Sequence, residues 1–289
     1  MPELRKDPVT GRWVIISTER RKRPSDFLPE HPLLSGEELC PFCPGQEDLT
    51  PPEVLAYRQS GSTLNGPGWD LRVVPNKFPA LQVEGSLDRQ GEGLFDRMNG
   101  IGAHEVIIET PDHAKTLTTM THSEVERVLW AFRERVLDLK RDRRFRYILL
   151  FKNHGAAAGA TLEHSHSQLI ALPIVPSLVR DELEGARRHF QAKERCVFCD
   201  IIRQEVAASP RIIEEHADII ALAPYAARFP FETWLLPRRH ASRFEEASRQ
   251  EYEGLARLIR SILLRMDRTL ERPAYNLIVH SSPLSEDTE

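Results

Sequence analysis

The hydrophobic pattern of this chain repeats itself at a long interval. A short apolar segment runs from Glu105 to His113 and a second one runs from Glu232 to His240, so each histidine follows its glutamate by eight residues. Apolar runs of this length predict short strands. Two such strands that end alike, at a histidine, indicate an internal repeat.

A predicted helix follows each of these strands. Apolar positions recur at the spacing of an amphipathic helix over residues 125–139 and again over residues 252–263. A further predicted strand comes after each helix, at residues 147–153 and 275–281, and begins 34 and 35 residues beyond the respective histidine. The chain is therefore interpreted as a tandem duplication with a period near 127 residues.

The boundary between the two copies is predicted after residue 172. Residues 173–176 read Pro-Ile-Val-Pro, and a charged segment that follows over residues 177–194 predicts a linking helix. The length of 289 residues allows two units of about 130–150 residues. We expect an α+β fold with domains at 1–172 and 173–289, each an antiparallel sheet with at least one packed helix.

Composition and charge narrow the class of protein. Apolar residues make up 40% of the chain and charged residues 28%, and no segment approaches the roughly 18 uninterrupted apolar residues of a membrane span. The net charge of −4 argues against a nucleic-acid footprint spread over the surface. The charged N-terminus lacks the apolar core of a signal peptide. We expect a soluble, cytoplasmic protein with neither a nucleic-acid nor a membrane partner.

All four cysteines fall into two identically spaced pairs, Cys40 with Cys43 and Cys196 with Cys199. In a cytoplasmic chain such pairs are typical of metal ligands rather than of disulfides, and zinc is the expected metal. The alternative interpretation is that the cysteines pack as small buried apolar residues. The duplication of the pair favours metal binding.

The segment His164-Ser-His166-Ser-Gln168 carries the candidate chemistry. On a strand, side chains alternate between faces, so both histidines and Gln168 are predicted on one face and both serines on the other. A row of two imidazoles and a carboxamide would need a partner for each polar group if it were buried. The pattern therefore indicates a functional site. A neutral imidazole near pH 7 is a good nucleophile and a good leaving group, which suits a two-step transfer.

These motifs resemble the galactose-1-phosphate uridylyltransferases of the histidine-triad superfamily, whose active-site motif is usually written His-Pro-His-x-Gln. The resemblance extends over nearly the whole chain. It includes the segments 7–15, 20–24, 40–43, 75–78, 111–113, 155–159 and 230–237. It implies two histidine-triad-like units and a ping-pong transfer in which a histidine attacks the α-phosphorus of a nucleotide-sugar. The nucleotidyl group then passes from the enzyme to a second phosphorylated acceptor, such as a hexose 1-phosphate.

The resemblance also assigns roles to residues. By motif position, His166 is the nucleophile, and Gln168 donates its amide N–H to a phosphoryl oxygen. Six further residues are implied in binding the nucleotide and its phosphates: Arg20, Arg23, Asn76, Asn153, Gly159 and Thr161. The small residues between 153 and 161 let the backbone come close to a phosphate. Relatives commonly form homodimers that share residues across the active site, so a homodimer is expected.

The resemblance implies two zinc sites. The first has four ligands, Cys40, Cys43, His113 and His164, and the second has Cys196, Cys199 and His240. His164 follows His113 by 51 residues, so its counterpart in the second copy would stand near position 291, beyond Glu289. The second copy is therefore expected to be truncated, which would leave its zinc without a fourth ligand unless His280 supplies one. Recognition of the hexose phosphate would be incomplete as well.

The nucleobase stays open at this point. Lys77 follows Asn76 where some uridylyltransferases carry an aspartate, and Ser165 replaces the proline of the motif. The serine and the two cysteine pairs are similar to the ADP-glucose phosphorylases, which move AMP onto phosphate by the same histidine chemistry. UDP-glucose:galactose-1-phosphate uridylyl transfer is the leading hypothesis and adenylyl transfer to phosphate is the alternative. A non-catalytic zinc- or nucleotide-binding protein is a third hypothesis.

Overall fold

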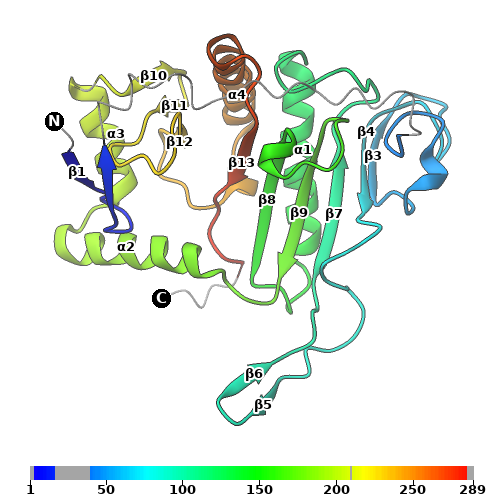
Figure 1. The fold of residues 1–289 in the computed structure, drawn as a ribbon, viewed down its shortest axis with the longest axis horizontal. Coiled ribbons are helices and arrows are strands. Elements are labelled where there is room, and N and C mark those ends of the chain that lie inside the picture. The colour runs from blue at the N-terminus through cyan, green and yellow to red at the C-terminus, as the bar shows by residue number, and fades with distance from the viewer. Residues whose placement is uncertain (1–2, 17–39, 209, 285–289) are drawn as a thin grey trace. The chain divides into compact units, whose positions relative to one another are not determined.

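The computed structural model describes residues 3–16, 40–208 and 210–284, which form two compact units (Figure 1). Each unit combines segments that are far apart along the chain. The described residues of the larger unit are 40–175, 243–245 and 263–284. Those of the smaller unit are 3–16, 176–208, 210–242 and 246–262. The division of the duplication at residues 172 and 173 stays a prediction.

The larger unit is built on a six-stranded antiparallel sheet with the strand order β13-β8-β9-β7-β4-β3. The strands are β3 (Leu55–Arg58), β4 (Trp69–Pro75), β7 (Ala103–Ile108), β8 (Tyr147–His154), β9 (His166–Leu172) and β13 (Tyr275–Val279). Helix α1 (His122–Leu139) packs against β4 and β7. A hairpin of β5 (Gln90–Glu92) and β6 (Phe95–Arg97) extends from this unit as an arm (Figure 1).

Helix α1 begins where the sequence supplies a capping box. The Thr121 side chain accepts a hydrogen bond from the backbone N–H of Glu124, and the Glu124 carboxylate accepts one from the backbone N–H of Thr121 at 2.7 Å. These bonds satisfy donors that the first helical turn leaves without partners. Buried apolar residues on one side of the helix then face the sheet: Val125, Val128, Leu129, Phe132 and Val136.

The smaller unit holds a three-stranded antiparallel sheet, two whole helices and residues 249–262 of a third helix, α4 (Arg249–Leu270). Its sheet has the order β10-β11-β12, and a separate hairpin pairs β1 with β2. Its elements are β1 (Glu3–Lys6), β2 (Trp13–Ile16), α2 (Ser177–Lys193), α3 (Val197–Ala208), β10 (Ile212–Glu215), β11 (Ile219–Leu222) and β12 (Trp234–Pro237). Helix α2 comes so close to the Val9 backbone that a Cβ at Gly185 would lie 1.6 Å from the Val9 carbonyl oxygen. Only glycine fits at that position.

The predicted fold class and elements are confirmed. Antiparallel sheets with packed helices are present, and both predicted strand–helix–strand series are found as β7, α1, β8 and β12, α4 (Arg249–Leu270), β13. The linking helix is α2. Among the described residues, no helix combines the length and the apolar character needed to cross a bilayer.

One strand lies elsewhere than expected. Each copy was expected to build its own sheet, but β13 joins the sheet of the larger unit beside β8, in a register that runs from Tyr275 opposite His154 to Val279 opposite Leu150. One edge of β8 pairs with β9. Without β13, the backbone N–H and C=O groups along the other edge of β8 would lack partners in the sheet. The second copy's strand supplies those partners.

A buried ion pair lies under the start of β9. Lys152 Nζ donates to Glu109 Oε2 at 2.8 Å, to Ser165 Oγ at 3.0 Å and to the His166 carbonyl oxygen at 2.9 Å. The Ser165 and Ser167 hydroxyls also donate to the Glu109 carboxylate. Burial alone would raise the pKa of Glu109, but the Lys152 charge and these hydrogen bonds hold it below its ordinary value.

This network replaces a missing part of the sheet ladder. The pairing of β8 with β9 ends at Phe151 opposite Gln168, although β8 continues to His154 and β9 begins at His166. β8 therefore diverges from β9 beside His166. The ammonium group of Lys152 bridges the gap, because it takes the His166 carbonyl that a ladder N–H would otherwise bond.

We predict that Lys152→Met lowers the free energy of unfolding by about 3–5 kcal/mol, because it leaves a buried carboxylate unpaired. In the wild type the pKa of Glu109 is depressed, so its contribution is present above the ordinary glutamate pKa and is lost as the pH falls through the folded value. In the variant the unpaired carboxyl group gains stability by taking up a proton. The deficit should therefore shrink as the pH falls, in urea unfolding measured between about pH 4 and 8.

The control is Lys115→Met, because Lys115 pairs with Glu124 at 2.7 Å with both side chains partly exposed. It should cost less than about 1 kcal/mol. Adding Glu109→Gln to Lys152→Met should recover part of the loss. An equal cost for both single lysine variants, with no pH dependence, would contradict the argument.

Candidate functional site

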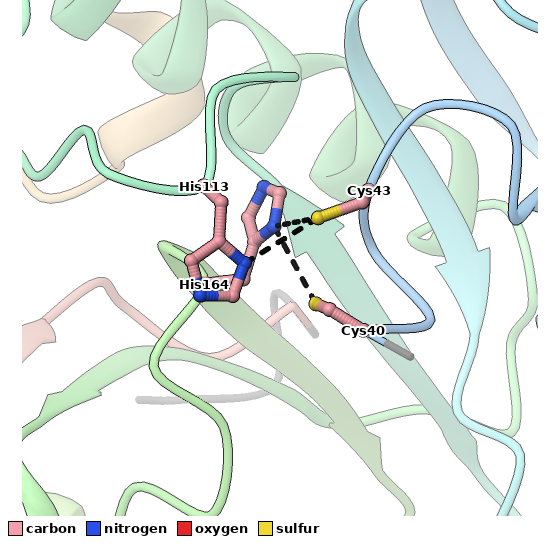
Figure 2. Close-up of side chains that lie close together, drawn as sticks. All are labelled: Cys40, Cys43, His113 and His164. Atoms are coloured by element: carbon pink, nitrogen blue, oxygen red, sulfur yellow. Dashed lines mark hydrogen bonds between the residues drawn. The ribbon is translucent and has the colours of Figure 1, made fainter. Parts of the chain in front are cut away.

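The first cysteine pair and two histidines meet at the end of the sheet (Figure 2). The ligand atoms of Cys40, Cys43, His113 and His164 all lie within 4.8 Å of one another. The Cys43 sulfur lies 3.4 Å from His113 Nδ1 and 3.6 Å from His164 Nδ1. Burial and the neighbouring Cys40 raise the pKa of the Cys43 thiol to about 11. Four soft and borderline ligand atoms at this spacing could hold a metal ion.

The orientation of His164 suits a metal ligand. His164 is fully buried, and its Nε2–H donates to the Thr110 carbonyl oxygen at 2.7 Å. A neutral imidazole has one protonated nitrogen, so Nδ1 carries the lone pair. Nδ1 is the nitrogen that faces both cysteines, at 3.6 Å from each sulfur. The chemistry of this group therefore fits a tetrahedral metal site.

His166 has the opposite arrangement. Its Nδ1 lies 2.8 Å from the backbone carbonyl oxygen of His164, so Nδ1 carries the proton and Nε2 carries the lone pair. The imidazole is 7% exposed, and burial lowers its pKa below the ordinary value. The Phe42 ring packs edge-on against it at a centroid distance of 5.4 Å. The result is a neutral, fixed imidazole with its nucleophilic nitrogen available.

Gln168 belongs to a chain of polar groups on the same face as His166. Its Oε1 atom lies 2.9 Å from His104 Nε2, and Asn76 Nδ2 lies 3.1 Å from the same nitrogen. The structure thus brings together Gln168 and Asn76, which the sequence analysis proposed separately. His104 joins them, and sequence analysis missed it. The sequence held no signal for His104, because the pairing of Val106 with Gln168, two residues further along β7, appears only in the register of the sheet.

The Asn153–Thr161 loop is held by the added strand β13. The Asn276 side-chain amide donates to Asn153 Oδ1 at 2.8 Å and to the Ala158 carbonyl oxygen at 3.0 Å. Gly159 has φ +87°, and a Cβ there would lie 3.5 Å from Asn153 Nδ2. The loop includes a short 3-10 turn, and Thr161 after it is exposed.

The backbone of this loop is less free than the sequence indicated. The N–H groups of Ala158, Gly159 and Ala160 donate to carbonyl oxygens within the loop itself, at residues 155 and 156. Because these three N–H groups already have acceptors, the side chain of Asn153 is better suited to donate a hydrogen bond to a phosphate. Asn276, like His104, was not found from the sequence.

The second cysteine pair forms a smaller group in the smaller unit. The ligand atoms of Cys196, Cys199 and His240 lie within 4.8 Å of one another, and the Cys199 sulfur is 3.4 Å from His240 Nδ1. Burial and the neighbouring Cys196 raise the pKa of the Cys199 thiol. Among the residues that the structure describes, this group has three members, whereas the first has four. His280 lies outside this unit, just after β13. Arg20 and Arg23 lie outside the described residues.

The chain is similar to known proteins along nearly its whole length. The chain is 36% identical to the ADP-glucose phosphorylase of Arabidopsis thaliana over 98% of its own length and 79% of the relative's. It is 30% identical to the galactose-1-phosphate uridylyltransferase of Haemophilus influenzae, over 100% of its own length and 81% of the relative's. The crystal structure of an Arabidopsis thaliana ADP-glucose phosphorylase with bound ADP-glucose superposes with a TM-score of 0.83 at 35% identity, over 99% of this chain and 85% of the other.

Family models lead to the same conclusion. The N-terminal domain model of galactose-1-phosphate uridyl transferase matches residues 1–176, and the C-terminal domain model matches residues 182–289. A solved uridylyltransferase structure superposes with a TM-score of 0.74 at 27% identity, over 99% of this chain and 82% of the other. Because the two models span nearly the whole sequence in order, this chain belongs to the galactose-1-phosphate uridyl transferase family.

Proposed function

We propose that this nucleotidyltransferase acts by ping-pong transfer through a nucleotidyl group bound covalently to His166. The observation that carries the proposal is the hydrogen bond from His166 Nδ1–H to the His164 carbonyl oxygen. It leaves the Nε2 lone pair available, and it stabilises the positive charge that the ring gains once Nε2 is substituted. The lowered pKa keeps this nucleophile unprotonated at neutral pH.

The proposed step balances without a further reactant. The Nε2 lone pair attacks the α-phosphorus of a nucleotide-sugar, and an N–P bond forms while the P–O bond to the sugar phosphate breaks. The sugar phosphate leaves with the electron pair. In the second half an oxygen of the acceptor phosphate attacks the same phosphorus, the N–P bond breaks, and Nε2 regains its lone pair. Gln168 donates its amide N–H to a phosphoryl oxygen in both halves.

We propose that five further residues help to bind the nucleotide and its phosphates besides Asn153. These are Arg20, Arg23, Asn76, Gly159 and Thr161. The support for Asn76 and Gly159 is their placement, because Asn76 lies beside the His104–Gln168 pair and Gly159 beside Asn153. The support for the two arginines is motif position alone, since a guanidinium group binds phosphate in bidentate fashion.

The leading activity is UDP-glucose:galactose-1-phosphate uridylyl transfer, because the family is named for galactose-1-phosphate uridyl transferase and the Haemophilus influenzae relative is a galactose-1-phosphate uridylyltransferase. A second activity has specific support. The Arabidopsis thaliana ADP-glucose phosphorylase is 36% identical to this chain, and Ser165 stands in the motif position of the usual proline. Adenylyl transfer to inorganic phosphate is therefore the alternative, and it would use the same His166 chemistry.

We predict that wild-type protein becomes covalently labelled by UDP-glucose carrying ³²P at the α-phosphorus, and that His166→Gly abolishes the labelling with little change in thermal stability. The label should be acid-labile, as phosphoramidates are. A parallel incubation with α-labelled ADP-glucose decides between the uridylyl and the adenylyl reaction. The measurement is the amount of label that stays with the denatured protein.

The control variant is His122→Ala, which removes an exposed histidine at the start of α1. It should be labelled like the wild type. Full labelling of His166→Gly would disprove the nucleophile. Wild-type protein that takes label from neither nucleotide would favour the non-catalytic binding protein over both transfer reactions.

We propose that the two Cys/His groups bind zinc. The first group offers the four ligands of a tetrahedral site: Cys40, Cys43, His113 and His164. Its role would be positional, because His164 stands two residues before His166, where β9 begins. In the second group, Cys196, Cys199 and His240 supply three ligands among the described residues.

All four cysteines are free thiols in the structure, which supports a reducing, cytoplasmic location.

We predict one tightly held zinc per chain and a second that is weaker, because four protein ligands close a tetrahedral site and three do not. Elemental analysis after mild chelation should leave about one equivalent. His164→Ala should remove the tight zinc and lower the melting temperature by on the order of 10 °C. His240→Ala should remove only the weaker one. Two zinc ions that resist the chelator equally would show that the second site is closed.

We propose that the protein forms a homodimer, as its family resemblance implies. The support from the structure is a set of exposed apolar side chains along residues 78–98 of the larger unit, the stretch of chain that contains the β5–β6 hairpin. These are Phe78, Val83, Leu94, Phe95 and Met98, with Leu94 98% and Phe95 77% exposed. Apolar side chains that gather on one segment mark an interaction surface rather than a solvated arm.

We predict that replacing Leu94 and Phe95 together by Asp shifts the protein from dimer to monomer in sedimentation velocity at micromolar concentration. Buried carboxylates at a subunit interface would lack partners. Leu64→Asp is the control, because Leu64 is 75% exposed in the turn between β3 and β4. If the wild type sediments as a monomer, the dimer proposal is wrong.

A further inference from the structure

His104 occupies a position between two groups that the proposed function uses. It projects from β7 on the face of the sheet that carries Gln168, and Val106 of the same strand lies opposite Gln168 in the register. The chain from 76 to 80 wraps around it. The Asn76 backbone N–H donates to the His104 carbonyl oxygen at 2.8 Å, and the Ala80 backbone N–H donates to His104 Nδ1 at 3.1 Å.

The Ala80 contact fixes the tautomer of His104. A backbone N–H can only donate, so Nδ1 must offer its lone pair. The proton of the neutral ring is therefore on Nε2. Two groups lie close to that nitrogen, Gln168 Oε1 at 2.9 Å and Asn76 Nδ2 at 3.1 Å.

Of these two groups, Gln168 is the one that can accept this proton. The Asn76 side chain already directs its oxygen elsewhere, because Asn76 Oδ1 accepts the Phe78 backbone N–H at 2.9 Å. Asn76 thus turns its NH₂ group toward the imidazole, and two donors cannot bond each other. The Nε2–H of His104 consequently donates to Gln168 Oε1.

We propose that His104 is a positioning residue that selects one of the two orientations of the Gln168 amide. This inference rests on the proposed nucleotidyl transfer. With Oε1 held by His104, the NH₂ group of Gln168 is the end left to meet a phosphoryl oxygen. In the flipped orientation the amide would turn an oxygen lone pair toward an anionic phosphate, which repels it. His104 therefore makes Gln168 a hydrogen-bond donor to the transferring group before substrate binds.

Two substitutions distinguish orientation of the Gln168 amide by His104 from a purely structural contact of His104 with residues 76–80. The amide of Asn at position 104 reaches about as far as Nδ1, so His104→Asn can still accept the Ala80 N–H but cannot donate to Gln168. The longer amide of Gln reaches about as far as Nε2, so His104→Gln can donate to Gln168 and loses the Ala80 contact. Each variant therefore loses one of the two His104 contacts and keeps the other. Gln168→Ala shows the effect of removing the proposed phosphate-binding amide itself.

The readout is the preference between the Rp and Sp diastereomers of α-thio UDP-glucose and α-thio ADP-glucose, measured as the single-turnover rate of protein labelling. Sulfur accepts hydrogen bonds weakly. The labelling rate should therefore fall when sulfur replaces the phosphoryl oxygen that the Gln168 NH₂ group bonds, and should fall less when it replaces the other oxygen. We expect His104→Asn to reduce the preference to that of Gln168→Ala, with kcat about tenfold lower and KM within about threefold. His104→Gln should keep most of the wild-type preference. Adding His104→Asn to Gln168→Ala should change little.

Two results would overturn the inference: a wild-type preference in His104→Asn, or an equal loss in both His104 variants. Either result would mean that His104 only supports the 76–80 segment. The proposed function is tested separately by the wild type, because unlabelled wild-type protein would refute nucleotidyl transfer itself. Urea unfolding of the two His104 variants should give equal midpoints, which confirms that the comparison is made between equally folded proteins.

Discussion

The alternation of side chains along the strand that begins at His166 is the constraint on which the site depends. A period of two sends His166 and Gln168 to one face and Ser167 to the other. The serine face meets the buried carboxylate of Glu109, which is paired with Lys152. Hydrogen bonds to Glu109 thus hold the serine face of the strand, and the opposite face carries His166 and Gln168. A register slip of one residue would exchange the two faces and destroy both.

The divergence of β8 from β9 follows from the same arrangement. A continued ladder would bring β8 alongside His166, and the backbone of this proposed nucleophile would then be paired on both sides. The strands separate after Phe151 instead, and the Lys152 side chain donates to the His166 carbonyl that has no partner in the ladder. A side-chain ammonium satisfies this acceptor without a second strand beside it. The exposed outer edge of β8 is in turn covered by β13.

What the sequence could predict was local or carried by a motif. The cysteine pairs, a helix over residues 125–139 and the two faces of the His164–Gln168 segment follow from spacing alone. The structure contains each of them, the helix as α1 with a start at His122. Arg20 and Arg23 lie outside the described residues and stay predictions. The family resemblance was predicted over nearly the whole chain, and the family models match residues 1–176 and 182–289.

What it could not predict depends on pairing between distant strands. Glu109 and Lys152 are 43 residues apart and Asn276 lies 123 residues from Asn153, so no periodicity within one element relates them. The pairing of β13 with β8 likewise joins strands that are more than 100 residues apart in the sequence. His104 has no pattern of its own, because its role appears only once β7 is set in register against β9.

The two histidines of the motif show how backbone carbonyls assign different chemistry to the same side chain. His164 and His166 share a face and are two residues apart, yet each gives a different nitrogen to a carbonyl oxygen, Nε2 to Thr110 and Nδ1 to His164. The lone pair of His164 is consequently on Nδ1, close to the backbone, where it faces the cysteine sulfurs. The lone pair of His166 is on Nε2, at the far end of the ring, where the proposed attack on phosphorus would take place. A carbonyl acceptor therefore decides which imidazole can hold a metal and which can attack a phosphate.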